Sequence, residues 1–325
     1  TTGVENVLIG GNAGDAITTG QYNVVMGKGA LPAEDTGSRN TAIGHAALQA
    51  LNYDGTGYNV AVGFWAGLSV TTGIGNTLVG GLAGDALTTG TGNTAIGYNA
   101  LSTEDGGGQN TAIGYQALAT LDAGANGLNT AVGYNSGYSM TTATSNSLLG
   151  DRAGYSITQG AENTFLGAYS GFGTTTGAGN VAIGFQALYA EDTHGTNVAI
   201  GYKTLKAQDA GANAYNVAIG YEAGNDVTTG TQNVLIGGLA GDTLTTGSYN
   251  IAIGHGALQA EDAHGKNIAI GRQALFAQDA GADAYNIAIG YNAGVSVSTG
   301  INNTIIGGLA GDALTTGAYN VALGY

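Results

Sequence analysis

Short apolar runs alternate with longer polar stretches at a fixed spacing along the chain. An Asn opens each apolar run and recurs from Asn6 to Asn320, at intervals of 17 residues in 14 cases and 19 residues in four. The fifth residue of every block, counted from this Asn as position one, is Gly. A repeat of this length predicts a solenoid in which each block forms one turn, or rung. We therefore expect an all-β parallel β-solenoid of about 18 rungs, with residues 1–325 as a single repetitive domain.

The apolar run of each block reads as a β-strand whose side chains alternate between two faces. Positions two and four share one face, and positions one and three share the other. We expect the aliphatic residue at position four to point into the core, as at Ile183, Ile200, Ile219, Ile236, Ile253 and Ile270. The small residue at position three would then line the outside, as at Ala182, Ala199, Ala218, Ala252, Ala269 and Ala288. A strand that is apolar on both faces is normally covered on both, which predicts self-association along this Ala stripe.

The recurrent Asn is best explained as a structural ladder. Identical amides on successive rungs, about 4.8 Å apart, can hydrogen-bond along the stack. The members that we assign to this ladder are Asn180, Asn197, Asn216, Asn233, Asn250 and Asn267. The Gly at position five predicts a bend with positive φ or close backbone approach.

A substitution rule at positions nine and twelve indicates a packed core. When position nine is Gly, as at Gly84, position twelve is apolar, as at Leu87. In four rungs position nine is Leu and position twelve is Glu: Leu31 with Glu34, Leu101 with Glu104, Leu188 with Glu191, and Leu258 with Glu261. One large side chain per rung therefore fills this space from one of two places, as close packing requires.

Composition narrows the function classes. Seven Lys and Arg against 22 Asp and Glu give a formal charge of −15, which disfavours binding to nucleic acid or anionic lipid. No apolar run approaches the roughly 20 residues of a membrane span. Charged residues are only 9% of the chain and Gly reaches 61 residues, a composition that suits an extracellular shaft better than a cytosolic enzyme. The chain begins and ends within a block, so we expect a segment of a longer fibre protein.

Acidic pairs are the candidate chemistry. Aspartates at the same block position on neighbouring rungs should lie within about 5–7 Å of each other. These pairs are Asp105 with Asp122, Asp192 with Asp209, and Asp262 with Asp279. Such carboxylates repel unless they are solvated or bridged by a cation, and calcium takes such oxygens. A solvated acidic edge without any cofactor is the favoured alternative.

Catalysis is not expected. The acidic pairs also suggest a glycosidase, but they recur in unit after unit, which fits architecture rather than one active site. No zinc-ligand spacing and no Ser-His-Asp constellation is present among the four His residues. GGLAGDAL at 80–87 and 307–314 is similar to the calcium repeat of secreted toxins, but the second Gly is displaced and the spacing is 70 residues or more, so its Asp is read as a turn residue.

The strand NVAIG at 180–184, 197–201 and 216–220 resembles the head repeats of trimeric autotransporter adhesins. The pattern NTAIGYNAL at 93–101 and NTAIGYQAL at 110–118 resembles the repeat regions of bacteriophage tail fibres more closely. The resemblance covers essentially all 325 residues. It implies a trimeric fibre on a virion or a cell surface, with a cell-surface glycan as a candidate receptor.

The sequence therefore predicts a non-catalytic structural shaft or adhesive segment of an extracellular fibre. A homotrimer is favoured over a head-to-tail filament, and neither nucleic-acid binding nor membrane insertion is expected. The alternative is a ligand-binding solenoid that binds ice or, with calcium, glycans. Ice binding is suggested by the Thr-Thr-Gly corners, although these occupy consecutive rungs only in pairs, as at Thr71-Thr72 and Thr88-Thr89.

Overall fold

The computed structural model describes residues 3–325, and these form two compact units that divide after Glu162. Every strand has three residues. The first unit contains β1 (Val7–Ile9), β2 (Val24–Met26), β3 (Thr41–Ile43), β4 (Val60–Val62), β5 (Thr77–Val79), β6 (Thr94–Ile96), β7 (Thr111–Ile113), β8 (Thr130–Val132) and β9 (Ser147–Leu149). The second contains β10 (Thr164–Leu166), β11 (Val181–Ile183), β12 (Val198–Ile200), β13 (Val217–Ile219), β14 (Val234–Ile236), β15 (Ile251–Ile253), β16 (Ile268–Ile270), β17 (Ile287–Ile289), β18 (Thr304–Ile306) and β19 (Val321–Leu323).

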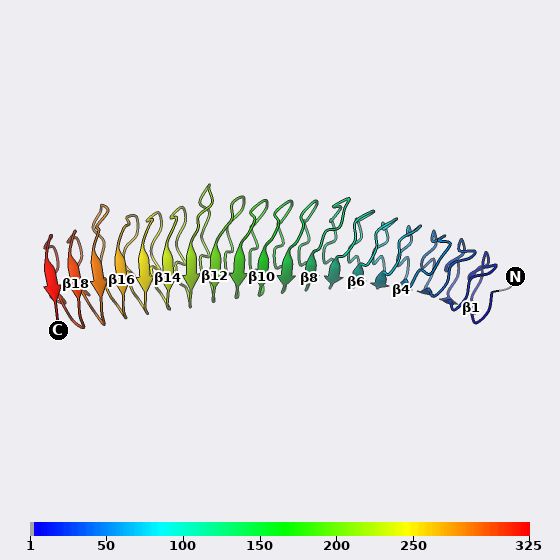
Figure 1. The fold of residues 1–325 in the computed structure, drawn as a ribbon, viewed down its shortest axis with the longest axis horizontal. Helices are drawn as coiled ribbons and strands as arrows, with labels where there is room; N and C mark the ends of the chain where they lie inside the picture. Colours follow the sequence, from blue (N-terminus) through cyan, green and yellow to red (C-terminus); the bar gives the residue numbers. More distant parts are fainter. Residues whose placement is uncertain (1–2) are drawn as a thin grey trace. The chain divides into compact units, whose positions relative to one another are not determined.

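Within each unit, every strand pairs in parallel with the strand of the next block, and block positions stay in register. Ala182 lies opposite Ala199, for example, and Ala199 opposite Ala218. Figure 1 shows the result in either unit, a stack of turns with one short strand per turn and the rest in bends and turns. The expected all-β parallel solenoid with a repeat of about 17 residues is confirmed. The interpretation of residues 1–325 as one domain stays a prediction.

Each strand ends at the position-five Gly because successive turns approach too closely there for a side chain. Gly220 has φ 138°, and a Cβ on it would lie 2.6 Å from the carbonyl oxygen of Gly237 on the next rung. A contact of that length with backbone cannot be relieved by moving a side chain. Only Gly combines this φ with this spacing.

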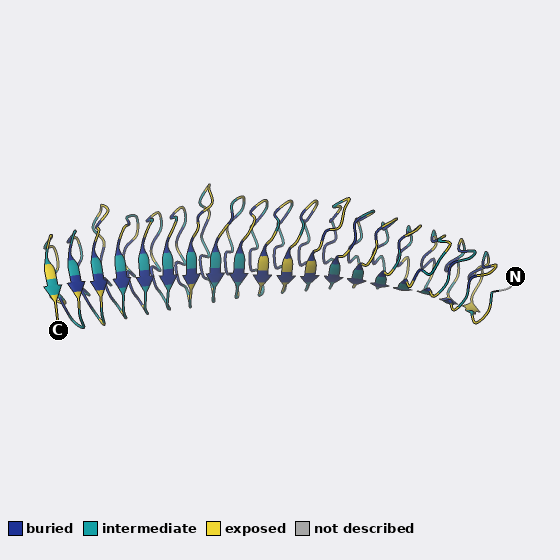
Figure 2. Cartoon of the chain, viewed as in Figure 1, coloured by how far each residue is buried: buried dark blue, intermediate teal, exposed yellow. Residues whose placement is uncertain are grey.

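The predicted directions of strand positions three and four are wrong. From β2 to β18 the middle residue of each strand is buried, and the residues on either side are half-buried or exposed. Ala182 is 0% exposed, whereas Ile219 is 37% exposed. The assigned core residues Ile183, Ile200, Ile219, Ile236, Ile253 and Ile270 therefore lie on the outer face, and the Ala stripe faces the inside of the coil. Figure 2 shows these buried and partly exposed strand residues side by side.

The reason for the reversal is the narrowness of the coil interior. Position three shares that interior with positions nine and twelve of the same and neighbouring rungs. A Cβ on Gly224 would meet Leu235, Leu205 and Val227 at 2.6, 3.1 and 3.2 Å, so these side chains already fill the space. Leu235 is itself the position-three residue of its rung, and position nine of that rung is Gly241. Rungs with Leu, Ile or Phe at position three all have Gly at position nine, so the side-chain volume that one rung can hold inside is limited.

The residues of the substitution rule at positions nine and twelve are buried, but the expected single large side chain per rung is not general. Leu48 with Leu51, and Leu118 with Leu121, are large and buried at both positions of one rung. Leu101 and Leu188 at position nine are 0% exposed, and so is Leu87 at position twelve. The alternative residue at position twelve, Glu, is buried as well, as at Glu104. An ionisable group thus occupies the place that an aliphatic side chain takes in other rungs.

The Asn side chains form a buried ladder in which the side chains hydrogen-bond to backbone groups about one turn further along the chain. Asn233 Nδ2 donates to the Gly247 carbonyl at 2.9 Å, and Asn233 Oδ1 accepts from the N–H of Asn250 at 2.9 Å. The six assigned ladder residues, Asn180, Asn197, Asn216, Asn233, Asn250 and Asn267, are all 0% exposed. The main hydrogen bonds between rungs thus join an Asn side chain to the backbone, rather than one Asn side chain to another as expected. These bonds also give partners to the buried backbone carbonyl and N–H groups of the corners.

We predict that Ala218→Asp disrupts the local rungs and that Ile219→Asp, one residue further, does not. The first change places an unpaired charge in the coil interior, which costs several kcal/mol, whereas the second places it on the outer face. Limited proteolysis should cut near residue 218 in the first variant only, because solenoid stability passes between neighbouring rungs. Equal protease resistance in the two variants would contradict this assignment of faces.

Candidate acidic corner site

The corners that follow position twelve bring acidic side chains together. Four glutamates at this position, Glu34, Glu104, Glu191 and Glu261, are 0% exposed. Three of them belong to groups whose nearest side-chain ligand atoms all lie within 4.8 Å of one another. These groups are Glu104 with Asp105 and Asp122, Glu191 with Asp192 and His194, and Glu261 with Asp262 and His264.

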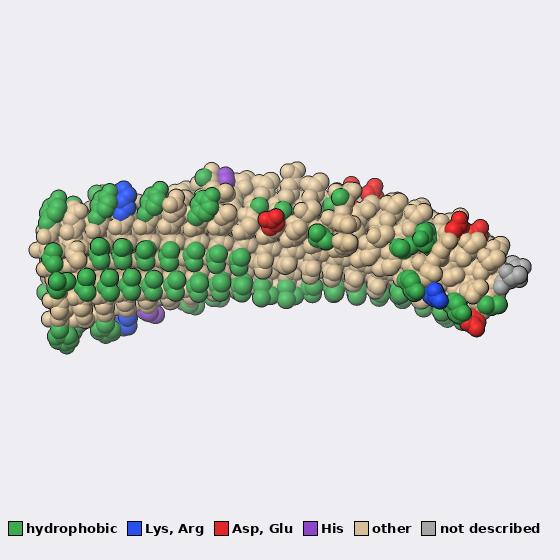
Figure 3. All heavy atoms as spheres, in the orientation of Figure 1, with side chains coloured by type: hydrophobic (Ala, Val, Ile, Leu, Met, Phe, Trp, Pro, Cys, Tyr) green, Lys and Arg blue, Asp and Glu red, His purple; other side chains and the backbone are tan. Residues whose placement is uncertain are grey.

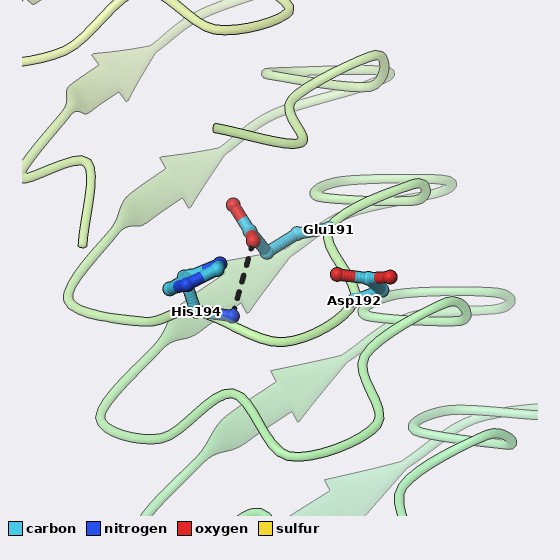
Figure 4. Close-up of side chains that lie close together, drawn as sticks. All are labelled: Glu191, Asp192 and His194. Carbon is cyan, nitrogen blue, oxygen red and sulfur yellow. Dashed lines mark hydrogen bonds between the residues drawn. The ribbon is translucent and has the colours of Figure 1, made fainter. Parts of the chain in front are cut away.

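Backbone and amide donors hold the buried carboxylates in place. The Glu104 carboxylate accepts from the N–H of Gly107 at 2.7 Å and from the N–H of Ala123, on the next rung, at 3.1 Å. The Glu191 carboxylate accepts from the N–H of His194 and from Nδ2 of Asn197, both at 3.3 Å. Figure 4 shows the Glu191 side chain turned toward the backbone N–H of His194. The first corner is thus more tightly bonded than the second.

The corner at Glu261 is the least satisfied of the three. Oε1 accepts from the N–H of His264 at 3.2 Å, and His264 Nδ1 lies 3.8 Å from the same oxygen. Glu261 Oε2 and His264 Nδ1 are buried and have no hydrogen-bond partner. A buried oxygen without a donor favours the neutral acid over the carboxylate.

Burial raises the pKa of these glutamates. The pKa of Glu191 rises to about 7, mainly because desolvation penalises the charged form, and the charges of Asp209 and Asp192 raise it further. Desolvation likewise raises the pKa of Glu261 to about 7, with the charges of Asp279 and Asp262 adding to it. The pKa of Glu104 is also raised by burial, against two backbone hydrogen bonds that lower it. The Glu191 and Glu261 corners therefore bind protons near neutral pH.

The structure places the six predicted aspartates at these corners. Asp105 and Asp122 come together with Glu104. Burial and then the charge of Asp192 raise the pKa of Asp209, so these two aspartates interact across rungs. The charges of Asp262 and Asp279 both act on Glu261. In each corner the buried Glu has a pKa that burial raises.

The donor sets fit a resident calcium ion poorly. Calcium takes about six to eight oxygen ligands, whereas each group offers three side-chain ligands. In the two groups with His, one of the three is nitrogen, which suits transition metals better. In each group the Glu already accepts hydrogen bonds from the protein. We therefore assign no chemistry at these corners to calcium.

Sequence reasoning missed the two histidines at these corners. The sequence shows no zinc-ligand spacing among its four His residues, and His194 and His264 lie four rungs apart. Each belongs to its own corner, three residues after the buried Glu, in the segments EDTH at 191–194 and EDAH at 261–264. The spacing Glu-Asp-x-His after a position-nine Leu was the signal that could have identified them.

Comparisons with known proteins give no relative. No family model matches the chain, and no curated protein or solved structure matches it. Among the described residues, no helix is long and apolar enough to cross a membrane. The function is therefore argued from the residues and their geometry alone.

We predict that stability falls as pH rises from about 4.5 to about 7. Glu191 and Glu261 have raised pKa values in the folded state, so the folded chain binds more protons than the unfolded chain in this window. Their contribution is fully present below the unfolded pKa and is lost as pH rises through the folded pKa. Melting temperatures measured across this range should therefore decline. The variants below separate the effect of these two glutamates from that of other titratable groups.

The double variant Glu191→Gln and Glu261→Gln should flatten that decline and raise the melting temperature at pH 8. Its control is Glu5→Gln, because Glu5 is exposed and should leave the pH profile unchanged. A double variant that keeps the full decline would show that other groups cause it.

Proposed function

We propose that this chain is a non-catalytic structural segment of an extracellular fibre that assembles with copies of itself. Repeated turns stacked in register suit a shaft or an adhesive segment of a phage tail fibre or surface adhesin, as the resemblance of its strands implied. The observation that carries the proposal is the outer face of the strands in the second unit.

Two columns of β-branched aliphatic residues run in register along that face. Position two contributes Val181, Val198, Val217, Val234, Ile251, Ile268 and Ile287 from β11 to β17. Position four contributes Ile183, Ile200, Ile219, Ile236, Ile253, Ile270 and Ile289. Figure 3 shows hydrophobic side chains as continuous rows over this unit. Seven rungs at about 4.8 Å each give an uncharged strip roughly 30 Å long.

Such a strip supports assembly because it is both apolar and regular. A contiguous apolar patch on this scale commonly marks an interaction site. Another copy of the chain has the same rung spacing, so its columns can pack against these along their whole length. The interface therefore belongs to positions two and four, and no longer to the Ala stripe that the sequence suggested.

A parallel homotrimer is the favoured assembly. In a trimer, each strip meets two neighbours around a common axis, and the residues beside the columns add to the contact. A head-to-tail filament would leave the strip exposed to water.

We predict that the isolated chain sediments as a trimer at micromolar concentration. The double variant Ile219→Lys and Ile253→Lys should sediment as a folded monomer, because it buries two charges in the interface without touching the coil interior. Analytical ultracentrifugation with circular dichroism would measure both properties.

The matched control is Tyr249→Lys, because Tyr249 is exposed outside the strands. This variant should remain a trimer. A wild-type chain that sediments as a stable monomer would refute the proposal, as would a lysine double variant that still forms trimers.

A second candidate function, ice binding, is favoured by the corresponding face of the first unit. There, position two is Thr in four successive rungs, Thr77, Thr94, Thr111 and Thr130, paired in register. Beside it, position four is Val or Ile. Hydroxyl and methyl groups repeated about every 4.8 Å can anchor an ordered layer of water. This array is longer than the paired Thr corners considered from the sequence.

If this face binds ice, the chain should show thermal hysteresis in a freezing assay. The double variant Thr94→Tyr and Thr111→Tyr should abolish it, because bulky rings interrupt the flat array. Thr89→Tyr, at an exposed corner, should leave it intact. A wild-type chain without thermal hysteresis would exclude the function.

A further inference from the structure

Exposed aromatic rings form short stacks at position six, the first residue after the strand-ending Gly. In the first unit, Tyr115 stacks on Tyr98 and on Tyr134, with centroids 5.7 and 5.3 Å apart. In the second unit, Tyr202 stacks on Phe185 and on Tyr221 at 5.5 and 5.4 Å. The parallel in-register rungs produce these stacks, because each ring lies directly above the one before it.

A Gly at position six interrupts the column next to each stack. Gly238 follows Tyr221 and precedes His255, and a Cβ on Gly238 would meet only His255 Cδ2 at 3.4 Å and the Tyr221 carbonyl oxygen at 3.9 Å. Tyr221 is 56% exposed, and its known stacking partner, Tyr202, covers only one ring face. Two rings two rungs apart thus flank a position that carries no side chain. We call this the Gly238 gap.

The chain itself shows what fits between rings two rungs apart. Immediately before the ladder Asn, Tyr22 and Tyr58 lie on rungs on either side of Arg39. The Arg39 guanidinium carbon lies 5.3 Å from the centroid of one ring and 5.7 Å from the other. This is the geometry of a cation enclosed by two π faces. The Gly238 gap likewise has one ring on the rung before it and one on the rung after it, with no side chain between them.

The charges around the Gly238 gap favour a cation as well. The charge of Glu222, beside Tyr221, raises the pKa of Tyr221; desolvation and a hydrogen bond between the Tyr221 hydroxyl and Glu222 raise it further. Burial raises the pKa of Asp242, and the charges of Asp226 and Glu222 raise it further. Lys203, one rung before Tyr221, lies over the Tyr202 ring at 5.1 Å, and Arg272, one rung after His255, lies over the Tyr291 ring at 5.5 Å, so each of these two cations already faces a ring. The side of the gap is therefore acidic.

We propose that the Gly238 gap binds a guanidinium group, as carried by an arginine of a partner protein, between Tyr221 and His255 with Glu222 at its side. A second copy of this chain is a poor source, because its own Arg39, Arg152 and Arg272 already lie over tyrosine rings. A neutral pyranose could also stack on these rings, but it would gain nothing from the acidic side. The two ligands are separated below.

The test follows the His255 imidazole by NMR while N-acetyl-arginine amide is added to the full chain. The resonance is assigned with His255→Gln, which removes one of only four His signals. We expect a saturable shift with a Kd of roughly tens of millimolar, as two exposed cation–π contacts of about 1 kcal/mol each imply. N-acetyl-citrulline amide, of similar shape but neutral, should bind markedly more weakly. Agmatine should bind similarly if the guanidinium alone is recognised, and more weakly if the peptide part of a partner contributes.

Filling the gap should abolish the shift. Gly238→Tyr places a ring where Tyr115 lies in the first unit, and its Cβ makes only ordinary contacts. Glu222→Gln keeps the gap and should weaken binding about two- to fivefold, as an exposed ion pair allows. This second variant keeps the test decisive if Gly238→Tyr folds poorly.

The matched control is Gly81→Tyr. Gly81 lies between Phe64 and Tyr98 in the same way, but the residue beside Phe64 is Trp65, which stacks on it at 4.7 Å, where the Gly238 gap has Glu222. This variant should leave the His255 titration unchanged. The proposal fails if arginine amide produces no saturable shift, if citrulline amide binds equally, or if methyl glucoside binds and arginine amide does not.

Discussion

The buried Asn that opens each block holds one turn to the next, and most other features depend on it. A three-residue strand supplies few backbone hydrogen bonds, and the corners would otherwise bury polar groups without partners. The Asn side chain meets both needs, because it donates to a corner carbonyl and accepts from the next Asn N–H, as Asn233 does. Each rung thereby presents the same acceptor to its successor. A different residue at this position would leave a donor and an acceptor unpaired at once.

Because this ladder keeps the blocks in register, each block position becomes a column on the surface. The chemistry of a column is set by the residue at one position in successive blocks. Val and Ile at positions two and four make an apolar strip in the second unit, and Thr at position two makes a hydroxyl row in the first. Aromatic residues at position six make ring stacks, and a Gly such as Gly238 opens a gap in them. One backbone can thus carry several distinct surfaces.

The buried glutamates show what this architecture tolerates in its interior. Glu191 and Glu261 occupy places that aliphatic residues take in other rungs, and burial raises both pKa values to about 7. Protonation lets such a carboxyl group stay in the core at a lower cost than a charge would. The nearby Asp charges add to the effect. The acidity of the chain therefore does not translate into fully charged corners at neutral pH.

The sequence by itself determined the period, the parallel in-register stacking, the Gly bend and the exchange of core volume between positions nine and twelve. These follow from the repeat, because identical blocks must meet identical neighbours. It also located the acidic corners, since aspartates such as Asp105 and Asp122 hold one block position on adjacent rungs. Only the tertiary structure decided which strand face is the inner one. Alternation separates the two faces but does not tell which one is the inner face when both are apolar, and it is the burial of Ala218 beside the exposed Ile219 that decides it. The pairing of His264 with Glu261 and the gap over Gly238 likewise depend on how corners fold and rings stack, which block positions alone do not specify.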